Sequence, residues 1–420
     1  MNDEALARLR ADPIDWRYKG FPPGDGVTPE TIGEQGWNLL GRDLLLPAMV
    51  LREGALAHNL ALMAGWCRKN GVSLAPHGKT TMSPELFARQ LAAGAWGITA
   101  ATTGQMRVYR AFGVERILLA NELVEGAAIR WLASELTDDP GFDAYCLVDS
   151  IEAVTAMEAA LAADSTSRSI PVLVELGLTE GRTGARSREA AIAVAEAVGR
   201  SSVLELAGVE CFEGIVHDRE RVDSFLADLR HLLKELVERG AFEHRAEVIV
   251  TAGGSVSFDR VVEIMSPAFR TTRTRIVLRS GCYLTHDHGL YDELSPFGAA
   301  GDATERLRPA LEAWAAVLSR PEPELALLGM GKRDVPYDVG LPVPVRVCDA
   351  SGLRGVAGTM TVFDLNDQHA YLRVSAGDGL AVGDLVGCGI SHPCTAFDKW
   401  RLIPVVDDDY TVVDAVHTFF

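Results

Sequence analysis

The chain has 420 residues, of which 48% are hydrophobic and 23% are charged, a composition typical of a globular protein. Its formal net charge of −18 argues against binding to nucleic acid or to an anionic membrane surface. No apolar run reaches the length of a membrane span, and the acidic start Met1–Glu4 lacks the apolar core of a signal peptide. The seven cysteines have no regular spacing, which suits a reducing compartment. We therefore expect a cytoplasmic protein.

The first 46 residues show neither helical nor strand periodicity, and an amphipathic helix is predicted over 54–69. From there, short apolar or β-branched runs alternate with longer stretches of helical period. Strands are predicted near 73–79, 96–100, 116–120, 144–148, 171–175, 206–211, 247–251 and 275–279. The intervening helices are predicted over 84–93, 104–112, 126–135, 150–162, 187–198, 219–239 and 257–265. Eight strands alternating with helices predict an α/β fold with parallel strands, and eight such units close a (β/α)8 TIM-type barrel. An open doubly wound sheet is the alternative.

After about Arg306 the helical periodicity fades, and short alternating runs punctuated by Gly and Asp predict an antiparallel β domain. Its strands are expected near 311–318, 324–328, 343–347, 358–363, 369–375, 384–388, 399–405 and 410–415. The barrel is therefore assigned to residues 47–305 and the β domain to residues 306–420.

The first predicted barrel strand ends in a lysine, in the sequence His77-Gly78-Lys79. A lysine in a partly desolvated site is easier to deprotonate, and a neutral amine can form a Schiff base with an aldehyde. The alternative is an ordinary surface lysine in a strand-to-helix loop.

Other polar residues collect at the ends of the later strands, where barrels carry their active sites. Gly181–Gly184 follows the fifth strand, Gly253-Gly254-Ser255 the seventh and Ser280-Gly281 the eighth. Free backbone N–H groups in such loops, together with a hydroxyl, suit a phosphate. A lysine and a phosphate cradle on one barrel face are the outline of a pyridoxal phosphate site.

The string Pro76-His77-Gly78-Lys79-Thr80 resembles the Pro-His-x-Lys-Thr signature of fold-type III pyridoxal phosphate enzymes. More narrowly, it resembles the D-serine dehydratase (deaminase) / D-threonine aldolase group, which is related to alanine racemase. The resemblance extends from Pro47 to about His417. It implies an alanine racemase-like barrel and a β domain to which residues 1–46 also belong.

The resemblance also implies roles for individual residues. Lys79 would be the catalytic residue, holding pyridoxal 5'-phosphate through a Schiff base and serving as the base at the substrate's α-carbon. The other cofactor-binding residues would be His77, Arg182, Gly253, Gly254, Ser255, Gly281 and Tyr283. Arg182 would lie near the pyridine nitrogen, and a loop ion pair with Glu180 or Glu175 is the alternative. Phe212 stands where relatives often have tyrosine.

In the β domain, His392-Pro393-Cys394 resembles the group's metal-binding His-x-Cys pair. Thiolate with imidazole suits zinc, which would assist the departure of a poor leaving group such as hydroxide. The alternative is that Cys394 is a buried thiol and that His392 hydrogen-bonds the cofactor phosphate.

Together these features predict a lyase that removes water from a D-3-hydroxyamino acid such as D-serine, giving a 2-oxo acid and ammonia. A D-threonine aldolase-type reaction or a racemase on the same scaffold is the alternative, and a non-catalytic pyridoxal phosphate carrier is the third. Relatives with aldolase activity more often have aspartate at the position of Cys394, which favours the dehydratase. Carriers resemble the barrel alone, so the β domain disfavours the third. The resemblance further implies a homodimer whose only other partner is the small-molecule substrate.

Overall fold

The computed structural model describes residues 1–420 except 25, 163–167, 217, 270–272 and 357. The chain folds into two compact units. The first, here called the barrel unit, contains Met1, Ala64–Lys79 and Gln90–Gly281. The second, here called the β unit, contains Asn2–Met63, Thr80–Arg89 and Cys282–Phe420.

Eight parallel strands form the sheet of the barrel unit, in the order β2-β9-β8-β7-β6-β5-β4-β3. They are β2 (Ser73–Leu74), β3 (Ile98–Ala100), β4 (Arg116–Glu122), β5 (Asp143–Val148), β6 (Ile170–Leu176), β7 (Leu204–Cys211), β8 (Val248–Ala252) and β9 (Thr274–Leu278). The two ends of this path are also joined, because Trp96 N donates to Leu74 O (2.7 Å) and Thr99 N donates to Pro76 O (2.9 Å). The predicted TIM-type, alanine racemase-like architecture is therefore confirmed.

The first barrel strand is shorter than predicted. Pro76 has no N–H to continue the ladder, and the chain turns at Gly78–Thr80 into the 3-10 helix η2. This turn places Lys79 just beyond the strand rather than within it.

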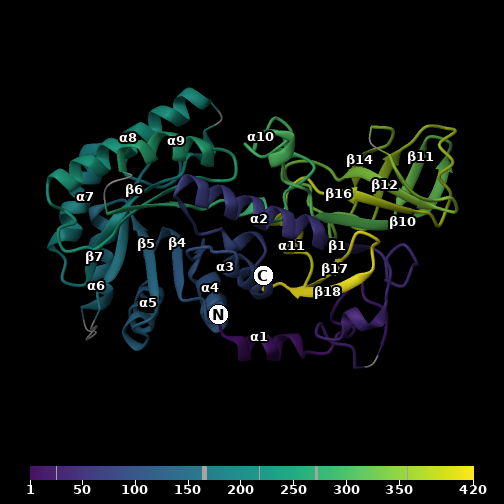
Figure 1. Cartoon of the computed structure of the whole chain (residues 1–420), viewed down its shortest axis with the longest axis horizontal. Helices are drawn as coiled ribbons and strands as arrows, with labels where there is room; N and C mark the ends of the chain where they lie inside the picture. The colour runs from purple at the N-terminus through teal and green to yellow at the C-terminus, as the bar shows by residue number, and fades with distance from the viewer. Residues whose placement is uncertain (25, 163–167, 217, 270–272, 357) are drawn as a thin grey trace. The chain divides into compact units, whose positions relative to one another are not determined.

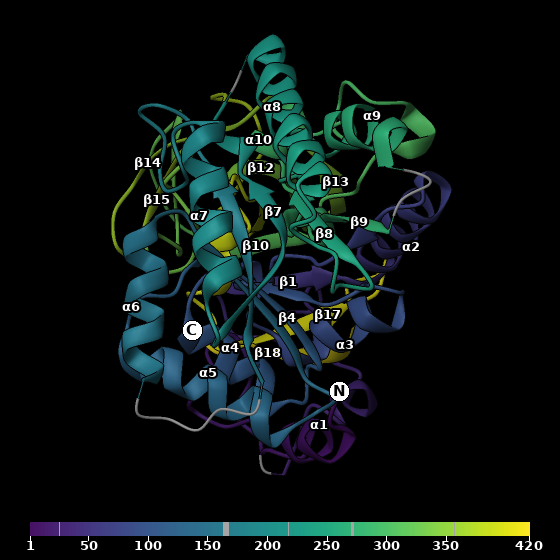
Figure 2. The same cartoon turned by 90° about the vertical axis from the view of Figure 1, so that its left-hand side faces the viewer.

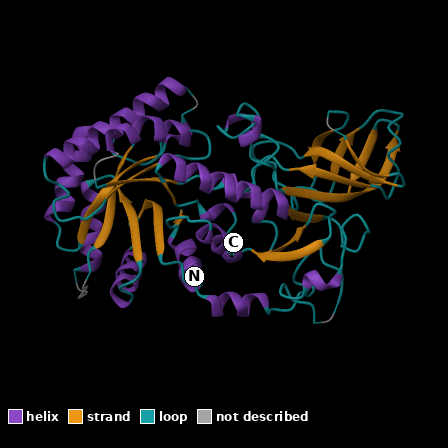
Figure 3. Ribbon diagram, in the orientation of Figure 1, coloured by secondary structure: helices purple, strands orange, loops and turns teal. Residues whose placement is uncertain are grey.

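Helices flank the strands of the barrel unit (Figures 1 and 3). They are α2 (Glu53–Asn70) and α3 (Pro84–Ala92), each shared with the β unit, and α4 (Thr103–Ala111), α5 (Gly126–Asp138), α6 (Ile151–Leu161), α7 (Arg188–Arg200), α8 (Arg219–Glu238) and α9 (Phe258–Phe269). Figure 2 shows α6, α7 and α8 in succession. Helix α8 buries residues three and four apart, including Phe225, Leu229 and Leu233, which is the spacing of an apolar stripe facing the sheet.

One hydrophobic cluster takes residues from successive barrel strands, as expected for the filling of a barrel interior. Its buried members are Ala75, Leu118, Tyr145, Leu147, Leu173, Ala207, Ile249 and Val277.

The β unit contains a ten-stranded sheet with the main path β13-β12-β16-β10-β1-β17-β18, to which β11, β15 and β14 are joined through β10. The strands are β1 (Ala48–Arg52), β10 (Leu311–Glu322), β11 (Leu325–Leu328), β12 (Val343–Asp349), β13 (Gly352–Gly355), β14 (Thr361–Leu365), β15 (Ala370–Arg373), β16 (Leu385–Gly389), β17 (Leu402–Val406) and β18 (Val412–His417). Its short helices are α1 (Asp3–Arg10), η1 (Ile32–Gln35), η4 (Cys282–Leu284), α10 (Leu290–Leu294), η5 (Ala303–Glu305) and α11 (Cys394–Phe397).

The structural division differs from the expected boundary at residue 47. Strand β1 was not predicted, and it pairs antiparallel with β10 and parallel with β17. Residues up to Met63 consequently group with the β unit. The N-terminal segment also contributes to the core of this unit, because Ile14, Phe21 and Leu39 belong to the same buried cluster as Trp314. In the described part of the chain, no helix combines the length and apolarity needed to cross a membrane.

Candidate active site

The end of the first barrel strand brings His77 and Lys79 to the rim where parallel barrels carry their chemistry. His77 N donates to Arg279 O (3.2 Å), which ties this rim segment to the end of β9. Between the two residues only glycine fits, because a Cβ at position 78 would lie 2.6 Å from the Tyr109 hydroxyl oxygen. Within the described residues, Lys79 has no hydrogen bond or ion pair.

His77 lies among cations. Burial lowers its pKa well below the ordinary histidine value, and the charges of Lys79, Arg279 and Arg182 lower the pKa further. The imidazole is therefore neutral at neutral pH. Its Nδ1 atom is buried and has no partner among the described residues. This part of the rim is thus electropositive and holds an unused polar atom.

The glycine loop after β8 already binds an anion. Both carboxylate oxygens of Glu213 accept hydrogen bonds from this loop, Oε2 from Gly253 N (3.0 Å) and Oε1 from Gly254 N (2.8 Å). Gly253 has φ +90°, and a Cβ there would lie 2.7 Å from a Leu278 methyl group, so glycine is required. Ser280 Oγ donates to the carbonyl oxygens of Gly253 and Gly254, which fixes the loop to the end of β9. The amides predicted to bind phosphate therefore do face a negative charge.

A buried ion pair crosses the same rim and was not predicted. Arg279 Nη2 lies 2.5 Å from Glu210 Oε1, and both side chains are almost fully buried. Burial raises the pKa of Glu210 to about 8, although the Arg279 charge opposes the shift. Arg279 also donates to Thr251 Oγ1 and to Cys211 O. The pair could not be predicted, because Glu210 lies within the apolar strand β7 and Arg279 directly follows the apolar strand β9.

Arg182 adopts neither of the ion pairs considered from the sequence. In the described part of the chain no salt bridge joins it to Glu175 or Glu180, and its guanidinium lies 4.2 Å from the centre of the Phe212 ring. Glu175 instead accepts a hydrogen bond from Thr183 Oγ1 (3.1 Å). Burial, followed by the neighbouring Glu175 carboxyl group, raises the pKa of Glu122 to about 9, so Glu122 at the end of β4 is protonated at neutral pH.

The barrel unit contains seven residues of the predicted set, namely Lys79, His77, Arg182, Gly253, Gly254, Ser255 and Gly281. These residues fit pyridoxal phosphate on three grounds. The paired amides hold a carboxylate that stands in for an anion, the His77 Nδ1 atom is unpartnered, and Lys79 is unpaired. Tyr283 lies outside this set, buried in η4 of the β unit.

The predicted metal pair lies in the β unit at the start of α11. His392 Nδ1 lies 2.7 Å from Asp338 Oδ2, and Thr395 Oγ1 donates to Asp338 Oδ1 (2.8 Å). Burial by itself lowers the pKa of His392, but hydrogen bonds with Cys394 and Asp338 outweigh it and raise the pKa to about 9. Asp338 was missed by sequence reasoning because 54 positions separate it from His392.

Cys394 has a second thiol as its neighbour. Its Sγ atom lies 3.6 Å from Cys282 Sγ and 3.5 Å from Thr80 Oγ1. The hydrogen bond from Cys282, followed by that from His392, lowers the pKa of the Cys394 thiol well below its ordinary value.

The donor set fits a soft metal. A carboxylate that holds Nδ1 leaves Nε2 of the histidine for a metal, which is the usual arrangement around zinc-bound histidines, and a thiolate lies beside it. Among the residues that the structure describes, no three His, Cys, Asp or Glu side chains are grouped to hold a metal ion.

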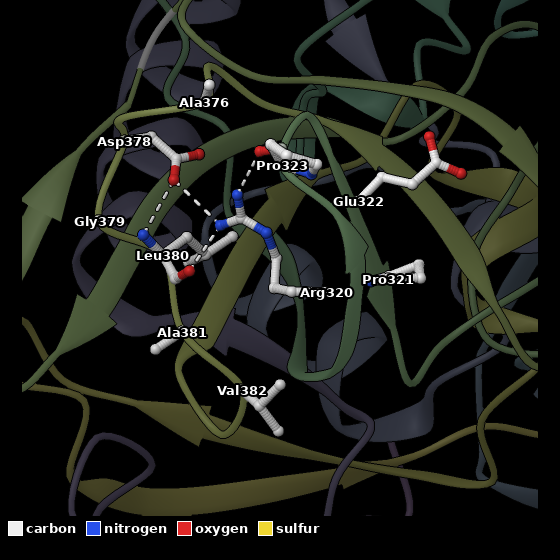
Figure 4. Close-up of a pocket in the computed structure, with 10 residues that line it drawn as sticks. All are labelled: Arg320, Pro321, Glu322, Pro323, Ala376, Asp378, Gly379, Leu380, Ala381 and Val382. Carbon is white, nitrogen blue, oxygen red and sulfur yellow. Dashed lines mark hydrogen bonds and ion pairs between the residues drawn. The ribbon is translucent and has the colours of Figure 1, made fainter.

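The β unit also contains a recess that is separate from the predicted site residues (Figure 4). It is lined by residues 320–323 and by residues 376 and 378–382. Its one arginine, Arg320, donates to Asp378 Oδ1 (3.1 Å) and to the carbonyl oxygens of Leu380 and Pro323 (2.5 and 2.6 Å). None of the predicted site residues lies in this recess.

Two family models match the chain. The alanine racemase N-terminal domain matches residues 51–263, and the putative serine dehydratase domain matches residues 310–406. The chain is 25% identical to D-threonine aldolase of an Arthrobacter species over 338 residues, 79% of this chain and 80% of that protein.

Solved structures agree with the fold. D-threonine aldolase from Filomicrobium marinum superimposes with a TM-score of 0.75 at 24% identity, covering 91% of this chain and 97% of the other. D-threo-3-hydroxyaspartate dehydratase from a Delftia species gives a TM-score of 0.71 at 22% identity, covering 91% and 99%. Two further matching structures are D-threo-3-hydroxyaspartate dehydratase variants in which a histidine or a cysteine is replaced by alanine, and the cysteine variant is in the metal-free form.

The barrel, its lysine-bearing rim and the added β unit define a fold-type III pyridoxal phosphate protein. The chain belongs to the family of the alanine racemase N-terminal domain and carries the putative serine dehydratase domain behind it. Its relatives are the D-threonine aldolases and the D-3-hydroxyaspartate aldolases and dehydratases.

Proposed function

We propose that the protein is a pyridoxal phosphate-dependent lyase that removes water from a D-3-hydroxyamino acid, with D-serine giving pyruvate and ammonia. The observation that carries this proposal is the position of Lys79. It is an unpaired lysine at the barrel rim, beside a buried neutral histidine and in the same unit as a pair of anion-binding amides.

The roles of the protein's residues follow from this rim. Pyridoxal phosphate, when bound, supplies an electron sink for the electron pair left at the substrate's α-carbon. Lys79 binds the cofactor and then presents a free amine as the base that removes the α-proton. Neutral His77 has Nδ1 available to hold the cofactor in place. Ser255 would bind the phosphate, and the glycine-loop amides would join it once Glu213 leaves them.

We propose zinc on His392 and Cys394 as the second cofactor. The bound metal supplies Lewis acidity to the departing β-hydroxyl, because hydroxide is a poor leaving group. Asp338 keeps His392 in the tautomer that offers Nε2. A D-threo-3-hydroxyaspartate dehydratase variant that lacks a cysteine is in the metal-free form, which supports a metal role for a cysteine in this fold.

The second candidate is aldol cleavage of the same class of substrate, giving glycine and an aldehyde. It is favoured by the curated relatives, which are D-threonine aldolase and 3-hydroxy-D-aspartate aldolase. The dehydratase is preferred here because the metal pair contains a cysteine. The homodimer implied by the family resemblance and the cytoplasmic location expected from the sequence both stay predictions.

One assay separates these candidates. The purified protein is incubated with pyridoxal phosphate, zinc and a panel of D-3-hydroxyamino acids, and 2-oxo acid and aldehyde are measured separately. We expect 2-oxo acid from D-serine with wild-type protein and with the control variant Lys69→Ala, and none with Lys79→Ala. If aldehyde forms in place of 2-oxo acid across the panel, the aldolase reaction is the correct proposal. If neither product forms, both proposed reactions are wrong.

A further inference from the structure

We propose that Cys282 and Cys394 form a redox-sensitive thiol pair that closes into a disulfide when it meets a low-molecular-weight disulfide. The chain has seven cysteines, all free and all in the described part. Only these two have sulfur atoms within hydrogen-bonding distance of each other there, at 3.6 Å. They lie 112 positions apart in the chain and within one unit, the β unit.

The geometry requires only a small movement. A disulfide bond is about 2.05 Å long, so the two sulfur atoms must approach by roughly 1.5 Å for the bond to form. Cys282 is held in the short helix η4 and is only 4% exposed, whereas Cys394 begins α11 and is partly exposed. Cys394 is therefore the thiol that an oxidant reaches first, and Cys282 is the thiol that resolves the intermediate.

The surroundings hold Cys394 in this position. Asp338 is hydrogen-bonded to His392 on one side of the cysteine and to Thr395 on the other. Thr80 Oγ1 lies 3.5 Å from the Cys394 sulfur. The segment around Cys394 is thus fixed at three points, and the thiol is kept beside Cys282 rather than turned away.

The reaction balances with a small disulfide made of two monothiols, such as oxidised glutathione. The Cys394 thiolate attacks one sulfur of the small disulfide and expels one thiolate, which leaves a mixed disulfide on Cys394. The Cys282 sulfur, after losing its proton to solvent, attacks Sγ of Cys394 and expels the second small thiol. The protein pair loses two electrons and two protons, and the small disulfide gains them.

Oxidation has a consequence for metal binding. A sulfur atom in a disulfide is no longer a thiolate and does not ligate zinc as a thiolate does. Closing the pair would therefore remove Cys394 from the proposed metal site and would be reversed by a dithiol reductant. This consequence rests on the proposed function, whereas the thiol pair itself does not.

Mass spectrometry tests the pair directly. Chelator-treated, full-length protein is exposed to oxidised glutathione, denatured, alkylated and digested. We expect the alkylatable thiols to fall from seven to five, with a peptide that links Cys282 to Cys394. Cys282→Ser should stop at the mixed disulfide on Cys394, and the control Cys388→Ser should still form the link. Absence of the linked peptide in wild-type protein would overturn the proposal. So would a Cys282→Ser variant that loses as many thiols as wild-type protein but carries no mixed disulfide on Cys394.

Zinc binding, measured on the same samples, separates this proposal from the proposed function. Oxidised wild-type protein should bind no zinc, and dithiothreitol should restore binding. If the linked peptide forms while zinc binding is unchanged, the thiol pair stands and the metal role of Cys394 is wrong.

Discussion

Glu213 Oε1 lies 2.8 Å from the backbone nitrogen of Gly254, inside the loop that was expected to bind phosphate. Glu213 is fully buried, and its second carboxylate oxygen accepts a hydrogen bond from the backbone amide of Gly253. A carboxylate and a phosphate dianion repel each other and cannot share these two donors. The glycine loop is therefore satisfied by the chain itself before any ligand binds.

Removing this carboxylate should expose the anion-binding donors. We expect Glu213→Ala to lose about 1–3 kcal/mol of stability, because two buried N–H groups lose their acceptor. Inorganic phosphate should then raise the thermal unfolding midpoint of Glu213→Ala more than that of wild-type protein. Glu213→Gln, which keeps one acceptor oxygen, should fall between the two. Equal phosphate effects in all three proteins would show that these amides do not bind the anion.

Asp338 is expected to control metal affinity without contacting the metal. Asp338 orients His392, and mutation of a residue that orients a metal-bound histidine usually weakens metal affinity by roughly 10–100-fold. We expect the same loss of zinc affinity in Asp338→Ala. Competition with a chromophoric chelator measures this affinity. Asp367→Asn is the matched control, because Asp367 forms only an exposed ion pair with Arg333. Unchanged zinc affinity in Asp338→Ala would place the metal elsewhere.

The metal should matter only when the leaving group is poor. We predict that a chelator stops the turnover of D-serine but spares D-β-chloroalanine, because chloride departs unaided. Cys394→Ala should behave like the chelated protein. Parallel assays of 2-oxo acid from the two substrates decide the point. D-serine turnover that survives chelation, or loss of both activities while the cofactor stays bound, would contradict the Lewis-acid role.

Glu122 should make stability depend on pH. Its pKa is about 9 in the folded state and 4.5 is the ordinary value, so between these pH values the folded state binds more protons than the unfolded state. Stability therefore falls as pH rises through this window. Glu122→Gln cannot titrate, so its thermal unfolding midpoint should fall less between about pH 5 and pH 9. The exposed Glu152→Gln should keep the wild-type slope. Identical slopes in all three proteins would refute the raised pKa of Glu122.

Features that depend on local sequence could be predicted, and features that depend on long-range pairing could not. Each barrel strand was anticipated because it is a short apolar run between helical stretches. The strand β1 was missed, because nothing in Ala48–Arg52 indicates pairing with β10 and β17 far along the chain. The Gly-rich β13 was missed because glycine is depleted in strands.

The same distinction holds for the site. Lys79, the glycine loop and the His392–Cys394 pair are contiguous motifs that a sequence displays directly. Their partners are not, because Glu213, Asp338 and Cys282 are joined to them only by folding. The alternative ion pair of Arg182 with Glu175 or Glu180 is absent from the described residues, and its guanidinium lies over the ring of Phe212, a contact that the sequence does not display.

The central claim is that Lys79 binds pyridoxal phosphate. The direct measurement is borohydride reduction of the protein with bound pyridoxal phosphate, followed by digestion and peptide mapping, with Lys79→Ala and Lys69→Ala treated in parallel. Our account predicts a pyridoxyl label on the Lys79 peptide of wild-type protein and of Lys69→Ala, and no label in Lys79→Ala. A label on any other lysine, or labelling that survives in Lys79→Ala, would contradict it.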